Sequence, residues 1–102
     1  MSSTIAVIAK ITAQPGKRPD VLSGMATMLT HVENEPGTLV YTLLEDQADA
    51  DVIWVYEEYT DQAALDSHST SDAMKALGGS IGPFLGGRPE IRILNIAGGK
   101  GR

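Results

Sequence analysis

The sequence contains no cysteine, and this absence excludes several kinds of site at once. Without cysteine there is no disulfide framework, no thiolate metal site and no cysteine nucleophile. Runs of basic residues are also missing, and 8 Lys and Arg residues against 13 Asp and Glu residues give a net charge of −5. Because affinity for nucleic acid comes largely from Lys and Arg on phosphates, this balance argues against a nucleic-acid partner.

Long apolar stretches are missing as well. No segment approaches the roughly 20 apolar residues of a membrane span, and the first eleven residues do not combine a basic start with an apolar run, as a signal peptide would. We therefore expect a cytoplasmic protein with no membrane partner. A chain of 102 residues predicts one domain, which we place at residues 1–97, followed by a disordered polar tail at residues 98–102.

Four stretches have the composition of β-strands, being rich in β-branched, aromatic and long apolar residues. They are residues 4–12, 38–45, 52–59 and 89–97, with the polar residues 46–51 suited to a hairpin loop. In the first three, side chains on both faces are largely apolar, so both faces of the sheet should be covered. Helices can cover only one of them, and a second copy of the chain is the simplest cover for the other. We therefore expect a homodimer.

Two further stretches are helical. Residues 17–34 carry a single apolar stripe at helical spacing, and residues 61–77 begin with a capping residue and continue with helix formers, in one piece or in two that meet near residues 69–71. The resulting order is β-α-β-β-α-β. It predicts an α+β protein of the ferredoxin-like class, with one four-stranded antiparallel sheet and its helices on one face.

Several short motifs at matching spacings accompany this order. They are Pro15-Gly16-Lys17 before the first helix, Glu35-Pro36-Gly37 with Tyr41, Glu57-Glu58-Tyr59, and Ala64-Leu65 with His68. With these motifs the chain, over residues 5–94, resembles the antibiotic biosynthesis monooxygenase family of small ferredoxin-like proteins. The resemblance implies a dimeric α+β barrel and cofactor-independent oxygenation of phenols, anthrones or quinols. The same family includes haem-degrading enzymes, an isomerase of a phosphorylated signal, and members with no known activity.

Two departures from the family narrow these options. The haem-degrading branch uses an Asn, a Trp and a His where this chain has Ala9, Tyr59 and Gly78, which argues against haem chemistry. Many members carry Pro-His-Phe where this chain has residues 72–74, Asp-Ala-Met, which argues against a mechanism with two histidines. We expect neither a metal nor another cofactor, because His31 and His68 without cysteine form no metal motif.

His68, Tyr59 and Glu57 are the candidate catalytic residues. The ordinary pKa of histidine, about 6.5, suits removal of a proton from a phenol or quinol, whereas the simpler alternative is a His68 that bonds a loop carbonyl. Tyr59 and Glu57 share one strand face. There Tyr59 could bond a substrate oxygen, and Glu57 could orient His68 or act as a base if burial raises its pKa. Their alternatives are a core aromatic residue and a solvated carboxylate, and we expect His31 to be a surface residue.

An adaptable apolar pocket for a flat ligand could form from six apolar residues, although plain core packing is the alternative. These candidate substrate-binding residues are Met25, Met28, Val55, Leu65, Met74 and Phe84.

Two classes of function remain open. The first is a cofactor-independent monooxygenase that removes a proton from a small aromatic, quinol or polyketide-like substrate and combines it with molecular oxygen. The second is a non-catalytic small-molecule binder, or an isomerase of a small signal metabolite. A closed apolar pocket with His68 and Tyr59 pointing into it would favour the first class. A polar, water-filled pocket with a cationic end would favour a phosphorylated or acidic ligand and so the second.

Overall fold

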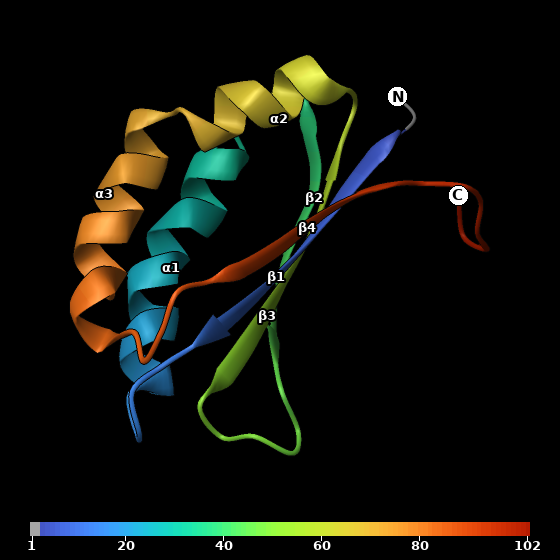
Figure 1. Cartoon of the computed structure of the whole chain (residues 1–102). Coiled ribbons are helices and arrows are strands. Elements are labelled where there is room, and N and C mark those ends of the chain that lie inside the picture. Colours follow the sequence, from blue (N-terminus) through green and yellow to red (C-terminus); the bar gives the residue numbers. More distant parts are fainter. Residues whose placement is uncertain (1–2) are drawn as a thin grey trace.

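The computed structural model describes residues 3–102 and has the predicted order of elements. The elements are β1 (Ile5–Thr12), α1 (Arg18–Val32), β2 (Thr38–Glu45), β3 (Val52–Tyr59), α2 (Gln62–Ser69), α3 (Asp72–Ile81), a 3₁₀ turn (Gly82–Phe84) and β4 (Glu90–Asn95). The helices lie on one side of the sheet (Figure 1). The ferredoxin-like α+β prediction is confirmed. Among residues 3–102, no helix combines the length and the apolar composition needed to cross a bilayer.

The second helical region consists of two helices, which settles the point that the sequence left open. The Asp61 side chain accepts a hydrogen bond from the amide of Ala64 at the start of α2. The Ser71 hydroxyl accepts one from the amide of Met74 at the start of α3. Each cap satisfies an amide that the first turn of a helix leaves without a partner. The cap at Ser71 therefore begins a second helix after α2 has ended at Ser69.

The sheet has the strand order β2-β3-β1-β4, and every neighbouring pair is antiparallel. The register pairs Val7 with Glu57 and Ala9 with Val55 across β1 and β3, and it pairs Tyr41 with Glu57 across β2 and β3. Paired residues point to the same face of a sheet. Glu57 and Tyr41 therefore share a face with Ala9 and Val55, which belong to the apolar core beneath the helices.

The main core lies between α1, α3 and the sheet, where Val21, Met25 and Met28 meet Ile53 and Val55. These side chains are at most 2% exposed. Gly24 explains how closely the two helices pack, because a Cβ atom there would lie 2.7 Å from Cγ2 of Ile81. The glycine inside α1 thus serves the contact between α1 and α3.

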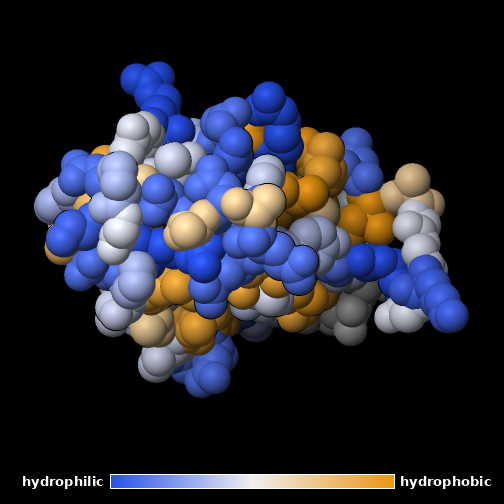
Figure 2. All heavy atoms as spheres, turned by 90° about the horizontal axis from the view of Figure 1, so that it is seen from below, coloured by the Kyte–Doolittle hydropathy of each residue, from blue (hydrophilic) through white to orange (hydrophobic). Residues whose placement is uncertain are grey.

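The opposite face of the sheet carries no helix, yet it has large apolar side chains. Leu44 and Leu94 on this face are 46% and 43% exposed. Seen from the end with the β2–β3 loop, hydrophobic atoms lie open among hydrophilic ones (Figure 2). Arg102, in the segment for which we expected disorder, pairs with Glu58 on this face at 2.9 Å. That contact holds the pKa of Glu58 at about 2, so the carboxylate stays ionised.

We expect the helix-free face to form a homodimer, because an exposed apolar sheet face is stabilised by a second copy. Light scattering at micromolar concentration should give twice the formula mass. Leu94→Asp should shift the mass toward the monomer, whereas Asn95→Asp, the next residue on the other face, should not. A wild-type protein that is a uniform monomer would contradict the expectation.

Candidate functional site

An apolar cavity of about 320 Å³ lies between the sheet and helices α1 and α3; we call it the apolar pocket. Its walls include Ile11, Met25, Val55, Met74, Leu77 and Ile81. Tyr41 and Glu57 supply the only side chains with polar atoms among its lining residues. An apolar cavity with few polar groups is the usual form of a small-molecule site.

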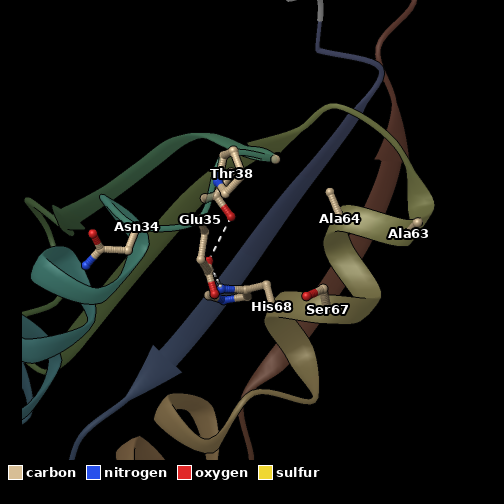
Figure 3. Close-up of a pocket in the computed structure, with 9 residues that line it drawn as sticks. Asn34, Glu35, Thr38, Ala63, Ala64, Ser67 and His68 are labelled. Atoms are coloured by element: carbon tan, nitrogen blue, oxygen red, sulfur yellow. Dashed lines mark hydrogen bonds and ion pairs between the residues drawn. The ribbon is translucent and has the colours of Figure 1, made fainter.

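A second cavity, of about 390 Å³, opens between the turn at residues 34–38 and α2; we call it the outer pocket. Its lining is more polar and includes Asn34, Glu35, Thr38, Ser67 and His68 (Figure 3). Glu35 and His68 contact each other in its wall. The outer pocket is therefore more polar than the apolar pocket, and the two lie on different sides of the His68 ring.

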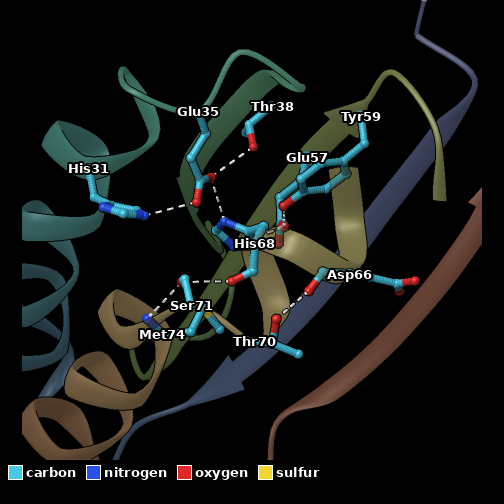
Figure 4. Close-up of polar contacts among 10 residues, drawn as sticks. All are labelled: His31, Glu35, Thr38, Glu57, Tyr59, Asp66, His68, Thr70, Ser71 and Met74. Carbon is cyan, nitrogen blue, oxygen red and sulfur yellow. Dashed lines mark hydrogen bonds and ion pairs between the residues drawn. The ribbon is translucent and has the colours of Figure 1, made fainter. Parts of the chain in front are cut away.

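His68 connects the two pockets. Its side chain is 3% exposed, and its Nδ1 lies 2.8 Å from Oε1 of Glu35, which lines the outer pocket. Its Nε2 lies 3.9 Å from Oε1 of Glu57, which lines the apolar pocket (Figure 4). The ring centroids of Tyr41 and Tyr59 lie 5.5 and 5.6 Å from the centroid of the imidazole. The ring is thus held between two carboxylates and two aromatic side chains.

Glu57 is a buried carboxyl group, with 7% of the residue exposed. The alternation along β3 turns it toward the helices, where the Tyr59 hydroxyl donates it a short hydrogen bond. Burial raises the pKa of Glu57, and the hydrogen bond from Tyr59 and the nearby His68 only partly oppose that effect. Burial also raises the pKa of Tyr41 and of Tyr59, so both stay neutral phenols near pH 7.

Glu35 is a site residue that sequence reasoning did not find. It accepts hydrogen bonds from Thr38 Oγ1 and from ring nitrogens of His31 and His68, each at 2.8 Å. Burial raises the pKa of Glu35, but these hydrogen bonds, above all that of His68, outweigh burial and lower it. The helical spacing of His31 and Glu35 was the available signal. His31, expected at the surface, has a side chain that is 36% exposed and is tied to this cluster.

The structure divides the predicted site residues between the pocket wall and its surroundings. Glu57, Met25, Val55 and Met74 line the apolar pocket. The other five lie outside that lining: Tyr59 and His68 beside Glu57, Met28 and Leu65 in the core, and Phe84 packed against the core. Among residues 3–102, no group of three or more His, Asp and Glu residues is arranged to hold a metal ion.

The raised pKa of Glu57 predicts a pH-dependent gain in stability for Glu57→Gln. The folded state binds the Glu57 proton more tightly than the unfolded chain does. Wild-type stability therefore falls as the pH rises from the ordinary glutamate value, about 4.3, through the raised value. Glutamine cannot ionise, so the variant should have the higher Tm near neutral pH. Its free energy of unfolding should exceed that of wild type by about 1.4 kcal/mol per unit of pKa shift.

Calorimetry from about pH 4 to about pH 8 measures this effect. The difference in Tm between Glu57→Gln and wild type should shrink toward zero at the acidic end. Glu90→Gln, at an exposed position of β4, is the matched control and should follow wild type throughout. A Tm difference that grows as the pH falls would contradict the assigned direction.

Known proteins resemble this chain in both sequence and fold. The sequence profile named antibiotic biosynthesis monooxygenase matches residues 4–78. A Caulobacter crescentus structure, provisionally named as such a monooxygenase, is 33% identical, with a TM-score of 0.88 over 94% of this chain and 92% of that one. A provisionally named monooxygenase of Mycobacterium tuberculosis is 31% identical over 92% of each chain.

An uncharacterised Synechocystis protein is 26% identical over 91% of this chain. This chain spans only 63% of that relative's length. The profile match covers most of the chain, and the Caulobacter structure is similar to it in sequence and in fold. The chain therefore belongs to the antibiotic biosynthesis monooxygenase family.

Proposed function

We propose that the protein is a cofactor-independent monooxygenase that acts on a small aromatic, quinol or polyketide-like substrate. One observation carries the proposal: Glu57, a carboxyl group whose pKa is raised by burial, lines a pocket that is otherwise almost wholly apolar. A base of this kind suits removal of a proton from a weakly acidic ring.

The walls of the pocket favour a flat apolar ligand. Met25 and Met74 have flexible thioether side chains that adapt to a ring, and Ile11 and Val55 come from neighbouring strands. The volume of about 320 Å³ is at the small end of ligand pockets. A ligand of few rings, held largely by apolar contact, fits this description.

In the proposed reaction, the Glu57 carboxylate takes a proton from the substrate and leaves an electron-rich anion. The neutral Tyr41 hydroxyl donates a hydrogen bond to the anionic oxygen. For an anthrone-type ring, a CH₂ group then becomes C=O: the substrate supplies four electrons, one oxygen atom enters the product, and the other leaves as hydroxide with the second hydrogen. The hydroxide takes up a proton from water, which balances the proton that Glu57 removed. The balance requires no separate reductant, and the dry pocket keeps water from the anion.

This assignment gives proton removal to Glu57 rather than to His68, the first choice from sequence. His68 and Tyr59 act through Glu57, since both contact its carboxylate and neither lines the apolar pocket. The alternative, an isomerase of a phosphorylated metabolite, finds less support, because no Lys or Arg is among the lining residues of either pocket.

The proposal predicts that purified protein carries no flavin, haem or metal. A freshly purified sample should show only the absorption of its Trp and Tyr residues, and elemental analysis should find no stoichiometric metal. A Soret or flavin band would contradict the cofactor-independent mechanism. The activity itself is tested by oxygen uptake with a panel of anthrones and quinols, against an autoxidation blank.

A further inference from the structure

We propose that His68 and Glu35 form a proton path that carries the substrate's proton from Glu57 to the outer pocket. The inference rests on the proposed function, and it adds a role for the outer pocket and for Glu35, which never meet the substrate. In it, the outer pocket is the exit through which the proton reaches water.

The groups form a continuous line whose two inner members are buried and whose two outer members are more exposed. From inside to outside, the side chains are Glu57 at 9% exposed, His68 at 3%, Glu35 at 17% and His31 at 36%. The two outer links are hydrogen bonds of 2.8 Å, and the inner link, between Glu57 Oε1 and His68 Nε2, is 3.9 Å. A shift of about 1 Å on ligand binding would bring the inner link to hydrogen-bond length, as catalytic contacts often tighten in complexes.

The resting proton position on His68 follows from the charge of Glu35. Hydrogen bonds lower the pKa of Glu35, so its side chain is a carboxylate and can only accept. Nδ1 of His68 therefore carries the hydrogen in the neutral ring, which leaves the lone pair of Nε2 toward Glu57. This tautomer is the one that can receive a proton from Glu57.

The proton transfer then has two steps. The O–H bond of protonated Glu57 breaks as an N–H bond forms at Nε2, which leaves Glu57 ionised and His68 as an imidazolium. The Nδ1 proton next passes to Glu35, and from there to water in the outer pocket. A flip of the imidazole ring then turns the remaining N–H toward Glu35 and places a ring nitrogen without hydrogen toward Glu57 before the next turnover. The other titratable groups that face His68 are Tyr41 and Tyr59, and the raised pKa of each makes it a poor carrier.

The path is needed because Glu57 lies in an apolar pocket, where few groups can take its proton. Once Glu57 has taken a proton, the base must be freed before the next turnover. Apart from Glu57, Tyr41 is the only titratable residue in the lining of that pocket. The outer pocket, by contrast, has hydroxyl, amide and carboxylate groups that hold water well. His68 is the group that separates the two environments.

Glu35→Gln tests the outer link. It should lower kcat by about 10-fold with little change in KM, since Glu35 does not line the apolar pocket. Glutamine cannot take up the proton from Nδ1 of His68, so the loss should appear in kcat rather than in KM. Glu33→Gln, an exposed position two residues earlier, is the matched control. An unchanged kcat in Glu35→Gln would overturn the path.

His68→Ala with added imidazole provides the sharper test, because the missing ring leaves a gap beside the outer pocket. The variant should lose about 10²-fold in kcat, and imidazole should restore the rate in proportion to its concentration. Ser69→Ala, at an exposed position of α2 that lines neither pocket, should keep the wild-type rate. A folded His68→Ala protein with wild-type kcat, or one that imidazole does not rescue, would overturn the path.

A second readout separates failure of the path from failure of the proposed function. Para-nitrophenol, whose anion is coloured, can report proton transfer without oxygenation. Temperature-jump relaxation should show slower anion formation in Glu35→Gln than in wild type, at equal bound phenol. An equal rate in the two proteins would overturn the path alone. A wild-type protein that neither ionises this phenol nor consumes oxygen would overturn both proposals.

Discussion

Glu57→Gln is expected to lower the rate of oxygen uptake with an anthrone or quinol by about 10²–10⁴-fold, the usual contribution of a general base. Glutamine keeps the shape of the side chain and can still accept the hydrogen bond from Tyr59, but it cannot take a proton. KM should change little, because the apolar walls that hold the ring are untouched. An oxygen electrode measures the effect directly.

Stability supplies the control for this loss. Because the variant is expected to melt at a higher temperature than wild type near pH 7, a lower rate cannot be ascribed to unfolding. Glu90→Gln, the same change at an exposed position, should keep the wild-type rate. A Glu57→Gln protein that works within about 2-fold of wild type would remove Glu57 from the role of base.

Gly37→Ala is expected to destabilise the protein by about 1–3 kcal/mol, the usual cost of forcing a methyl group into a filled space. A Cβ atom at Gly37 would lie 2.5 Å from Cβ of Ala64 in α2 and 3.3 Å from Oγ1 of Thr60. The turn that carries Glu35 therefore packs directly on the helix that carries His68. Chemical denaturation measures the loss, and the rate of oxygen uptake should fall with it.

Two further variants test this explanation. Gly79→Ala, inside α3 with nothing within 4 Å of the added Cβ, should instead stabilise the protein by up to about 1 kcal/mol. The double variant of Gly37→Ala and Ala64→Gly should recover part of the loss, because the two methyl groups no longer collide. If Gly37→Ala and Gly79→Ala behaved alike, the contact between the turn and α2 would not be the cause.

The fold was predictable because its signals are local. The apolar composition of the strands and the stripe along residues 17–34 are repeated patterns, and the structure has strands and a helix in those places. The break between α2 and α3 was harder to place, because it depends on whether the Ser71 hydroxyl caps an amide. Such a choice is made by geometry that the residue type alone does not fix.

The site was less predictable, because a periodic apolar stripe shows which face of a helix is buried but not which of its residues line a cavity. Met25 and Met28 belong to the same stripe of α1 and are each 1% exposed, yet only Met25 reaches the wall of the apolar pocket. Glu35 was missed for a similar reason. It lies in a turn, and its link to His68 joins positions 33 residues apart, which no local pattern reports.

The fate of heavy oxygen gas tests the central claim most directly. Wild-type protein should be supplied with an anthrone or quinol under labelled oxygen, and the product should be analysed by mass spectrometry. If Glu57 deprotonates a substrate that then reacts with oxygen, wild-type protein should form singly labelled product well above the amount in the protein-free blank, and the Glu57→Gln sample should stay near that blank. If wild-type protein forms no more labelled product than that blank with any substrate of the panel, the monooxygenase account is wrong.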